Sequence, residues 1–340
     1  MMSIGTLASP VMPSTTAKLV LGAKLADSSA DVLGYEHHSK GRVGLYMAAA
    51  SGFMLMAPAF ISSSFLGYSM VSSLPEGYRD VTWMQWFLAM IPWAILFFII
   101  MFFAISLFYG PKRKMGEKKA AESKTEDVPA EKHKFTKNEA ITAVIMIVCL
   151  IFWILEKQSG INSGVVALIG GLACFATGIL KNDDLKTAVP WGLILLIGAV
   201  FALGDVFSAT GISNWIVSLL GPLLLGIKSP VLIIIFVFVS TVIVRFALAS
   251  QTACIMLLPS VFGSIVIAAG INPFVVGVVI YSAIPVWILS YQNPTFMAGV
   301  QAMDGSISHS DTVKGAFIYL IVALIISLLM IPYWSLLGYL

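Results

Sequence analysis

The sequence predicts an all-α, polytopic membrane protein with inverted repeats, two re-entrant helical hairpins and interrupted helices. Three observations support this prediction. Hydrophobic residues make up 59% of the 340 residues and charged residues only 11%, against roughly 25% charged residues in a soluble domain. Apolar runs recur along the chain, and two adjoin hydroxyl-rich tripeptides, Ser14-Thr15-Thr16 and Ser250-Gln251-Thr252. At bilayer depth such polar breaks are tolerated only where they line a cavity or are buried in protein.

The first repeat is predicted over residues 1–109. A helix over 17–33 follows the first tripeptide, and Pro58 and Ser62-Ser63-Ser64 interrupt the next helix, over 43–70. The uninterrupted run 84–109 is predicted to span the membrane, since about 20 apolar residues cross the hydrocarbon. By analogy with the second repeat, this repeat is expected to be incomplete, with only the second half of its hairpin.

The second repeat is predicted over residues 140–340, with an outer hairpin over 230–270. Its interrupted helix covers 274–303 and is broken by Gln292-Asn293-Pro294. The other helices are expected over 140–156, 163–180, 190–220, 230–247, 253–270 and 314–338. Matching interruptions in two halves of a chain are typical of transporters built from inverted repeats.

Residues 110–139 are predicted to be a cytoplasmic loop because they hold nine Lys or Arg residues and no apolar pattern. This orientation places the first hairpin on the inner side, the second on the outer side and the C-terminus outside, in a cell membrane. Charge counts alone do not separate a hairpin from two full crossings, so the hairpin prediction rests on the tripeptides.

Several function classes are excluded. The net charge is only +3 and the basic residues do not form a nucleic-acid patch. The sequence contains no HExxH, phosphate-loop or nucleophile-elbow motif, so no enzyme is predicted. The three cysteines lie in apolar runs, where they are expected to act as small hydrophobic residues. His37 and His38 follow Glu36, and a solvated loop is favoured there over a metal site.

The tripeptides suggest two kinds of chemistry. Free backbone N–H groups at a helix N-terminus attract an anion, whereas freed carbonyl and hydroxyl oxygens suit a hard cation such as sodium. The alternative is that Ser and Thr only cap helices or join them. Two tripeptides at inverted positions favour the binding interpretation.

The segments PSTTAK (13–18) and SQTACIMLLP (250–259) resemble the paired Ser-Asn-Thr motifs of the divalent anion/sodium symporters. Residues 81–88, 190–215 and 331–338 also resemble parts of that family. The resemblance implies a secondary active transporter, symporter or exchanger, for small divalent anions such as dicarboxylates, citrate or sulfate. It further implies sodium as coupling ion, no other cofactor, an elevator movement and a homodimer in the lipid bilayer.

Carried over residue by residue, the motif's Ser and Thr match Ser14, Thr16, Ser250 and Thr252, while Thr15 and Gln251 replace its middle Asn. The expected substrate-binding residues are Ser14, Thr15, Thr16, Lys18, Ser250, Gln251, Thr252, Asn293, Pro294 and Thr295. The expected sodium ligands are Ser14, Ser62, Ser63, Ser64, Ser250 and Thr252.

Two intramembrane cations stand out, because such residues are functional candidates by default. Lys18 is expected either to hold a substrate carboxylate, to replace a bound cation, or to reach the inner surface by snorkelling. Arg245 is expected to pair with a buried acid, for which Asp205 is the nearest candidate.

An alternative function follows from the resemblance, because the family's carriers have several more helices before the first motif. The chain is then a non-transporting fragment, or a subunit of a split carrier that needs a separately encoded N-terminal half. The upstream reading frame would discriminate between these interpretations.

Overall fold

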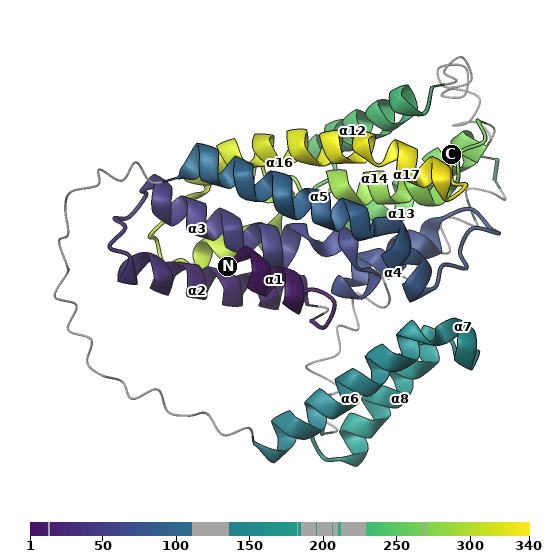
Figure 1. Cartoon of the computed structure of the whole chain (residues 1–340), viewed down its shortest axis with the longest axis horizontal. Helices are drawn as coiled ribbons and strands as arrows, with labels where there is room; N and C mark the ends of the chain where they lie inside the picture. Colours follow the sequence, from purple (N-terminus) through teal and green to yellow (C-terminus); the bar gives the residue numbers. More distant parts are fainter. Residues whose placement is uncertain are drawn as a thin grey trace. The chain divides into compact units, whose positions relative to one another are not determined.

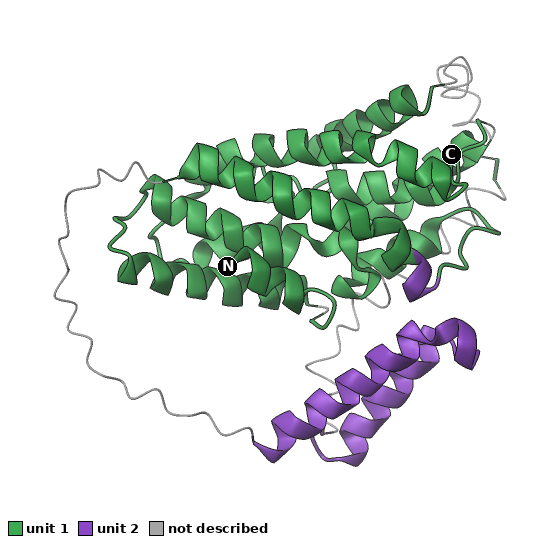
Figure 2. Cartoon of the chain, viewed as in Figure 1, with its two compact units in different colours: residues 1–81, 86–111, 196–340 green, residues 82–85, 112–195 purple. Residues whose placement is uncertain are grey.

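The computed structural model of the chain describes residues 1–12, 14–110, 136–181, 183–184, 195, 206, 210–211, 229–267 and 269–340 (Figure 1). The regular elements in this part are all helices, which confirms the predicted all-α class. The chain divides into two compact units (Figure 2). Unit 1 comprises residues 1–81, 86–111 and 196–340, and unit 2 comprises 82–85 and 112–195. Unit 1 therefore contains elements of both predicted repeats.

The first repeat contains a predicted interrupted helix. Its first half, α3, ends at Ala50 and continues into a π turn. Two 3₁₀ turns, the first of which contains Pro58, then lead through extended Phe60 and Ser64 to α4. A short helix, α1, precedes the first tripeptide and was not expected from the sequence. The helices are α1 (Met2–Ala8), α2 (Thr15–Val32), α3 (Lys40–Ala50), α4 (Phe65–Ser73) and α5 (Trp83–Tyr109).

The second repeat in unit 1 also follows the predicted order. Pro230, Pro273 and Pro294 each occupy a first helical position, where the missing N–H costs nothing. The predicted start of the last helix at residue 314 is wrong, since a Ser308–Asp311 capping box starts it at His309. The helices are α12 (Pro230–Ala247), α13 (Gln251–Ile267), α14 (Pro273–Ala283), α15 (Pro294–Gln301), α16 (His309–Leu329) and α17 (Ile331–Leu336).

Four helical segments in the described part are long and apolar enough to cross a bilayer: Trp83–Tyr109, Lys137–Ile154, Pro230–Ala247 and His309–Leu336. Apolar side chains on them are exposed; Leu107 of α5, for example, is 77% exposed. Such a surface suits lipid rather than water. The predicted helix over 190–220 and nearly all of the predicted loop 110–139 lie outside the described residues.

Unit 2 contains the helix pair predicted over 140–156 and 163–180. The pair consists of α6 (Lys137–Ile154), one turn α7 (Glu156–Ser159), and α8 (Ser163–Ala176). Trp153 Nε1 donates to the Ser163 carbonyl at 3.1 Å. Gly170 of α8 leaves room for the Cys149 sulfur of α6, which would lie 2.6 Å from an added Cβ.

Reciprocal packing joins the two predicted repeats in unit 1. The helix after the first tripeptide, α2, packs on α15, and the helix after the second tripeptide, α13, packs on α4. Each therefore contacts the second half of the other repeat's interrupted helix. Hydrogen bonds accompany both contacts: Thr16 Oγ1 lies 3.1 Å from Thr295 Oγ1, and Ser73 Oγ donates to the Ile255 carbonyl at 3.0 Å. This exchange of partners is expected of two inverted copies of one unit.

An aromatic cluster fills the centre of unit 1. Trp287, between α14 and α15, stacks on Phe296 with ring centroids 4.2 Å apart, and it also contacts Tyr319 of α16 at 5.7 Å. The cluster continues from Phe296 to Tyr46 of α3 and from Tyr319 to Phe97 of α5. All five side chains are buried. The residue after Thr295 is thus anchored in the core.

Replacing Gly52 by alanine is expected to destabilise the protein by about 1–3 kcal/mol, the usual cost of overpacking. A Cβ at this position would collide with the backbone carbonyl of Met2, so α1 would have to separate from the π turn Ser51–Leu55. Thermal unfolding in detergent measures the effect. Gly171→Ala in α8 is the control, because nothing lies within 4 Å of its added Cβ. An equal response of both variants would contradict the close approach of α1.

Candidate functional site

The first tripeptide forms the start of α2. Ser14 is the N-cap, and its Oγ accepts a hydrogen bond from the Ala17 backbone N–H at 3.4 Å. The Thr15 hydroxyl oxygen is buried and has no hydrogen-bond partner among the described residues. Thr16 is exposed and shares its hydroxyl bond with Thr295. Ser14 therefore caps the helix, while the Thr15 hydroxyl beside it makes no hydrogen bond to the described residues.

The second tripeptide repeats this arrangement at the start of α13. Ser250 Oγ accepts from the Ala253 backbone N–H at 3.1 Å, as an N-cap does. The next two side chains, Gln251 and Thr252, are half-buried, and neither makes a hydrogen bond to the part of the chain that the structure describes. Capping thus accounts for the two serines, whereas the side chains of Thr15, Gln251 and Thr252 have no hydrogen-bond partner in the described part of the chain.

The predicted residues of the second interruption differ in their surroundings. Asn293 is buried, and both polar atoms of its amide are hydrogen-bonded: Nδ2 donates to the Pro285 carbonyl at 3.2 Å and Oδ1 accepts from the Phe296 N–H at 3.0 Å. Pro294 is exposed, and Thr295 reaches Thr16 across the repeats. Asn293 therefore positions the N-terminus of α15, and the Thr295 hydroxyl lies at this N-terminus, where it contacts Thr16.

The three serines of the first interruption are buried. Ser62 Oγ donates to the Pro10 carbonyl at 2.9 Å, and Ser64 Oγ accepts from the Leu66 N–H and caps α4. Both oxygens of Ser63, the carbonyl and the hydroxyl, accept hydrogen bonds from Lys18 Nζ, at 2.9 and 2.8 Å. The ammonium group of Lys18 therefore occupies oxygens that the sequence suggested as sodium ligands.

Lys18 does not reach the inner surface, so the snorkelling alternative is wrong. Its side chain is fully buried, and its third hydrogen bond goes to the Ser9 carbonyl at 3.5 Å. These contacts join α2, the segment after α1, and the first interruption. Sequence spacing alone gave no sign of Ser9 or Ser63 as partners, because they lie 9 and 45 residues away.

Arg245 is also fully buried. Its guanidinium donates to four backbone carbonyls: Ile284 at 3.0 Å, Ala249 at 2.7 Å, and those of Leu248 and Gln292. Leu248 and Ala249 immediately precede Ser250, and Gln292 belongs to the second interruption. The expected partner Asp205 lies outside the described residues, so that pairing stays a prediction.

A polar cluster that the sequence did not reveal lies away from the tripeptides. Arg42 of α3 bonds Asp27 at 2.5 Å and also Asp31 of α2. Ser306 Oγ donates to Asp27 at 2.6 Å, and His38 Nδ1 lies 2.7 Å from Asp311. The described residues contain no group of three or more His, Cys, Asp or Glu side chains placed to hold a metal. The cluster therefore joins the turn after α2 to the start of α16.

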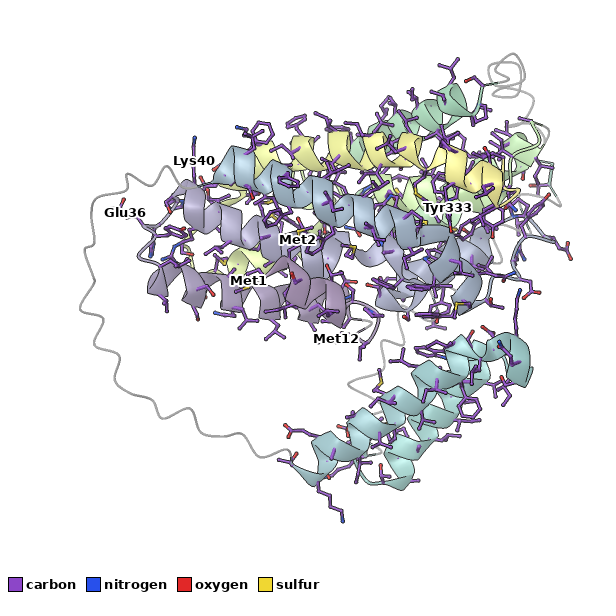
Figure 3. All side chains as sticks on the ribbon, viewed as in Figure 1. Met1, Met2, Met12, Glu36, Lys40 and Tyr333 are labelled. Carbon is purple, nitrogen blue, oxygen red and sulfur yellow. The ribbon has the colours of Figure 1, made fainter. Side chains whose placement is uncertain are left out.

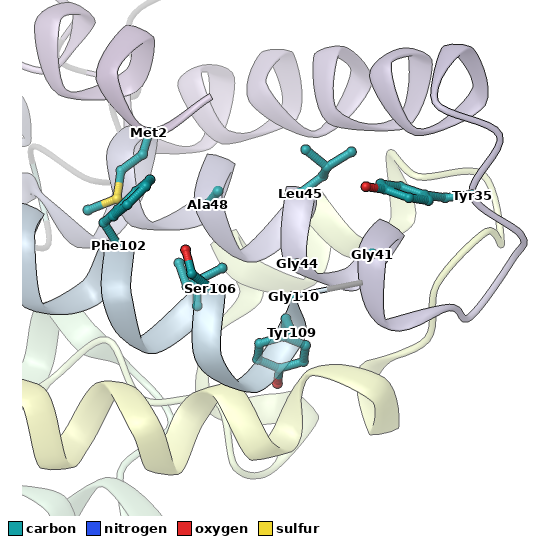
Figure 4. Close-up of a pocket in the computed structure, with 11 residues that line it drawn as sticks. Met2, Tyr35, Gly41, Gly44, Leu45, Ala48, Phe102, Ser106, Tyr109 and Gly110 are labelled. Carbon is teal, nitrogen blue, oxygen red and sulfur yellow. The ribbon is translucent and has the colours of Figure 1, made fainter. Parts of the chain in front are cut away.

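The ends of unit 1 can be told apart in Figure 3, where Glu36 and Lys40 lie toward one end and Tyr333 toward the other. Met12, two residues before Ser14, lies between these ends along the long axis. The predicted orientation would put Lys40 inside and Tyr333 outside. A separate cavity of about 290 Å³ lies between α1, α3 and α5, and Figure 4 shows the residues that line it. No charged side chain lines it, so it is unsuited to a small dianion.

Comparison with known proteins identifies the family. The family profile for the sodium:sulfate symporter transmembrane region matches residues 4–340. Relatives include an uncharacterized transporter of Haemophilus influenzae, 23% identical over 55% of this chain and 38% of its own length. Solute carrier family 13 member 1 of Mus musculus is 24% identical over 55% of this chain and 36% of its own length. The chloroplastic dicarboxylate transporter 1 of Spinacia oleracea is 22% identical over 59% of this chain and 36% of its own length.

The chain thus spans less than two fifths of the length of these three relatives. The family and the named relatives are transporters rather than enzymes, as the absence of a catalytic motif predicted. A multi-pass membrane protein agrees with the long apolar helices of the described residues. The chain belongs to the sodium:sulfate symporter family.

Proposed function

We propose that the chain binds and carries small divalent anions, such as dicarboxylates, citrate or sulfate, between the two tripeptides. The observation that carries the proposal is the similarity of the two tripeptides: in each, the serine caps a helix, and the side chain of the next residue makes no hydrogen bond within the described part of the chain. Helix N-termini attract anions through free N–H groups and the helix dipole. The packing of α2 on α15 brings the start of α15, with Thr295, beside the start of α2.

Charge supports an anion as the substrate. Lys18 and Arg245 lie beside the first and second tripeptides, and their hydrogen bonds in the described part go to neutral oxygens. A buried charge without a partner is costly, so an anion bound nearby is favoured. The expected substrate-binding set remains part of this proposal, with Asn293 acting through the position of α15.

The finer features of the carrier are also proposals. The cytoplasmic position of residues 110–139, the outside C-terminus, a homodimer and an elevator movement follow from loop charge and from family membership. Sodium is the coupling ion that the family suggests. At the first interruption, however, a sodium ion would compete with Lys18 for both oxygens of Ser63.

A second candidate function is that of one subunit in a larger assembly. In this alternative the chain is a subunit of a split carrier and transports only with a separately encoded N-terminal half. Co-expression with the product of the upstream reading frame, followed by co-purification and an uptake assay, tests it. Uptake by the chain alone would rule it out.

Replacing Thr252 by valine tests the binding site directly. Valine has nearly the shape of threonine, and the lost hydroxyl makes no hydrogen bond within the described part of the chain. The affinity for a dicarboxylate or sulfate is expected to fall about tenfold, which corresponds to one hydrogen bond of roughly 1.4 kcal/mol. The melting temperature without anion is expected to stay unchanged. Isothermal titration in detergent measures the affinity.

Thr241→Val is the matched control. Its hydroxyl is buried on α12 and donates only to the carbonyl of Val237 in the same helix, at 2.7 Å. This variant is expected to bind anions as the parent protein does. Undiminished affinity in Thr252→Val, or an equal loss in both variants, would argue against the proposed site.

A further inference from the structure

The cavity between α1, α3 and α5 corresponds to the position of α12 in the other predicted repeat. In chain order, α1 and α12 each precede a tripeptide, α3 and α14 begin the interrupted helices, and α5 and α16 follow those helices. The helix α12 packs on α14 and α16. These are the counterparts of α3 and α5, which bound the cavity. The repeat correspondence therefore predicts that a helix fits over the cavity.

The two corresponding helices differ in length, and the cavity extends from the end of the shorter one. The helix α12 has 18 residues, whereas α1 has 7. Met2, in the first turn of α1, lies beside Phe102 at one end of the cavity, and Tyr35 and Gly41 lie at the other end (Figure 4). Along α5 the cavity reaches from Phe102 to Tyr109, a distance of about 10 Å or roughly two helical turns.

Small residues continue an existing helix contact into the cavity. Gly41, Gly44 and Ala48 of α3 line the cavity at helical spacing, and Gly52 follows at the same spacing in the π turn. Gly52 already lies against the backbone of Met2, since an added Cβ would be 2.3 Å from the Met2 carbonyl oxygen. Small residues on one face let two transmembrane helices approach closely. The contact that α1 makes at Gly52 can therefore continue along the other three residues.

The size of the cavity suits apolar side chains of a docked helix. Its volume of about 290 Å³ is nearly twice that of a protein cavity that binds benzene, so it has room for roughly two large apolar side chains. A second cavity, of about 300 Å³, lies elsewhere on α5 and is lined by Phe60, Phe87 and Ile95 among others. The described residues that line this second cavity include no glycine, so it suits a lipid chain better than a helix backbone.

We propose that the cavity between α1, α3 and α5 is the docking site for an apolar helix of a second polypeptide. The docked helix continues the line of α1 and inserts its side chains between α3 and α5. The proposal rests on the second candidate function, in which the chain is one subunit of a split carrier, and it adds the surface by which the subunits join. Docking gives the first tripeptide a preceding helix on α3 and α5, as α12 on α14 and α16 precedes the second.

The test co-expresses the full chain with the tagged product of the upstream reading frame and measures the fraction of the chain that co-purifies in mild detergent. Phe102→Ala removes a half-exposed side chain that lines the cavity. It is expected to lower the co-purified fraction about tenfold, because side-chain packing drives the association of helices in membranes. Phe103→Ala is the matched control: Phe103 is the next residue of α5, is exposed and does not line the cavity. It is expected to leave the fraction unchanged.

A second pair of variants fills the cavities instead of enlarging them. Ala48→Phe places a ring in the proposed docking site. It is expected to abolish co-purification without lowering the melting temperature of the isolated chain. Ala94→Phe places the same ring in the second cavity and is expected to leave co-purification unchanged. This pair tests the docking site even if Phe102→Ala lowers the amount of folded chain.

The outcomes distinguish the docking site from the candidate function. If every variant co-purifies as the parent chain does, or if each variant and its control show equal losses, the docking site is overturned and the split carrier stands. If the parent chain does not co-purify, or takes up labelled succinate or sulfate alone in proteoliposomes, the split carrier and the docking site are overturned together. Anion binding by the chain is tested separately, by the titration of Thr252→Val.

Discussion

Arg245→Met is expected to lower the free energy of unfolding by about 3 kcal/mol, because several buried carbonyls lose their donor at once. The guanidinium bonds the carbonyls of Leu248, Ala249, Ile284 and Gln292. These carbonyls come from three segments outside the α-helices, and Gln292 belongs to a short 3₁₀ turn. Methionine fills much of the volume but donates no hydrogen bond. The end of α12 would therefore lose its connection to the second interruption.

Thermal or denaturant unfolding in detergent measures this effect, with Arg79→Met as the control. Arg79 is exposed and donates through Nε to a single carbonyl, that of Leu74, at 2.7 Å. Its replacement is expected to change stability by no more than about 0.5 kcal/mol. Equal unfolding midpoints for Arg245→Met and the parent protein would show that the guanidinium does not hold these segments together.

The order of the helices was predictable because hydrophobic runs, prolines and hydroxyl clusters are local signals. The helix over 230–247 was predicted at its observed bounds. Both interruptions include expected residues, Pro58 to Ser64 in one and Gln292 and Asn293 in the other, but the α-helices before them end earlier, at Ala50 and Ala283. The start of α16 was missed, because a capping box extends a helix through polar residues that carry no hydropathy signal. The helix α1 was missed because seven residues are too few for a periodic pattern.

The contacts of the site were predictable only in part. The tripeptides identified Thr16, and the second interruption identified Thr295, yet their hydrogen bond joins residues 279 positions apart. Long-range partners such as Ser63 for Lys18, or Ser306 for Asp27, depend on tertiary packing and have no local signature. The sequence thus shows which polar side chains belong to the candidate site. It does not show whether a buried cation such as Lys18 bonds a carboxylate or a backbone carbonyl. Lys18 shows this clearly, since three alternatives were open before its contacts were known.

The reciprocal packing explains why substitutions in the aromatic core are expected to affect anion binding at the tripeptides. Thr295 lies one residue before Phe296, which stacks on Trp287 and contacts Tyr46. Tyr46 OH also donates to the Phe296 carbonyl at 2.8 Å. The position of the Thr295 hydroxyl beside Thr16 therefore depends on an aromatic cluster drawn from both repeats.

Trp287→Ala is accordingly expected to destabilise the protein by about 3–5 kcal/mol, the range for loss of a large buried aromatic side chain. It is also expected to weaken anion binding, because Phe296 and the adjacent Thr295 lose their support. Trp287→Phe is the graded comparison: it keeps a ring but loses the hydrogen bond from Nε1 to the Thr312 carbonyl at 3.2 Å. Its expected cost is about 1–2 kcal/mol.

Unfolding midpoints and anion affinities of the two variants, measured on the same preparations, separate the two effects. If the cluster positions Thr295, affinity should fall in the order parent, Trp287→Phe, Trp287→Ala, and the losses should shrink when Thr295 is already valine, because coupled residues are not additive. If affinity instead falls equally with and without Thr295→Val, the cluster stabilises the fold but does not position the hydroxyl. The double-mutant cycle thus tests whether the core of one repeat controls the binding surface shared with the other.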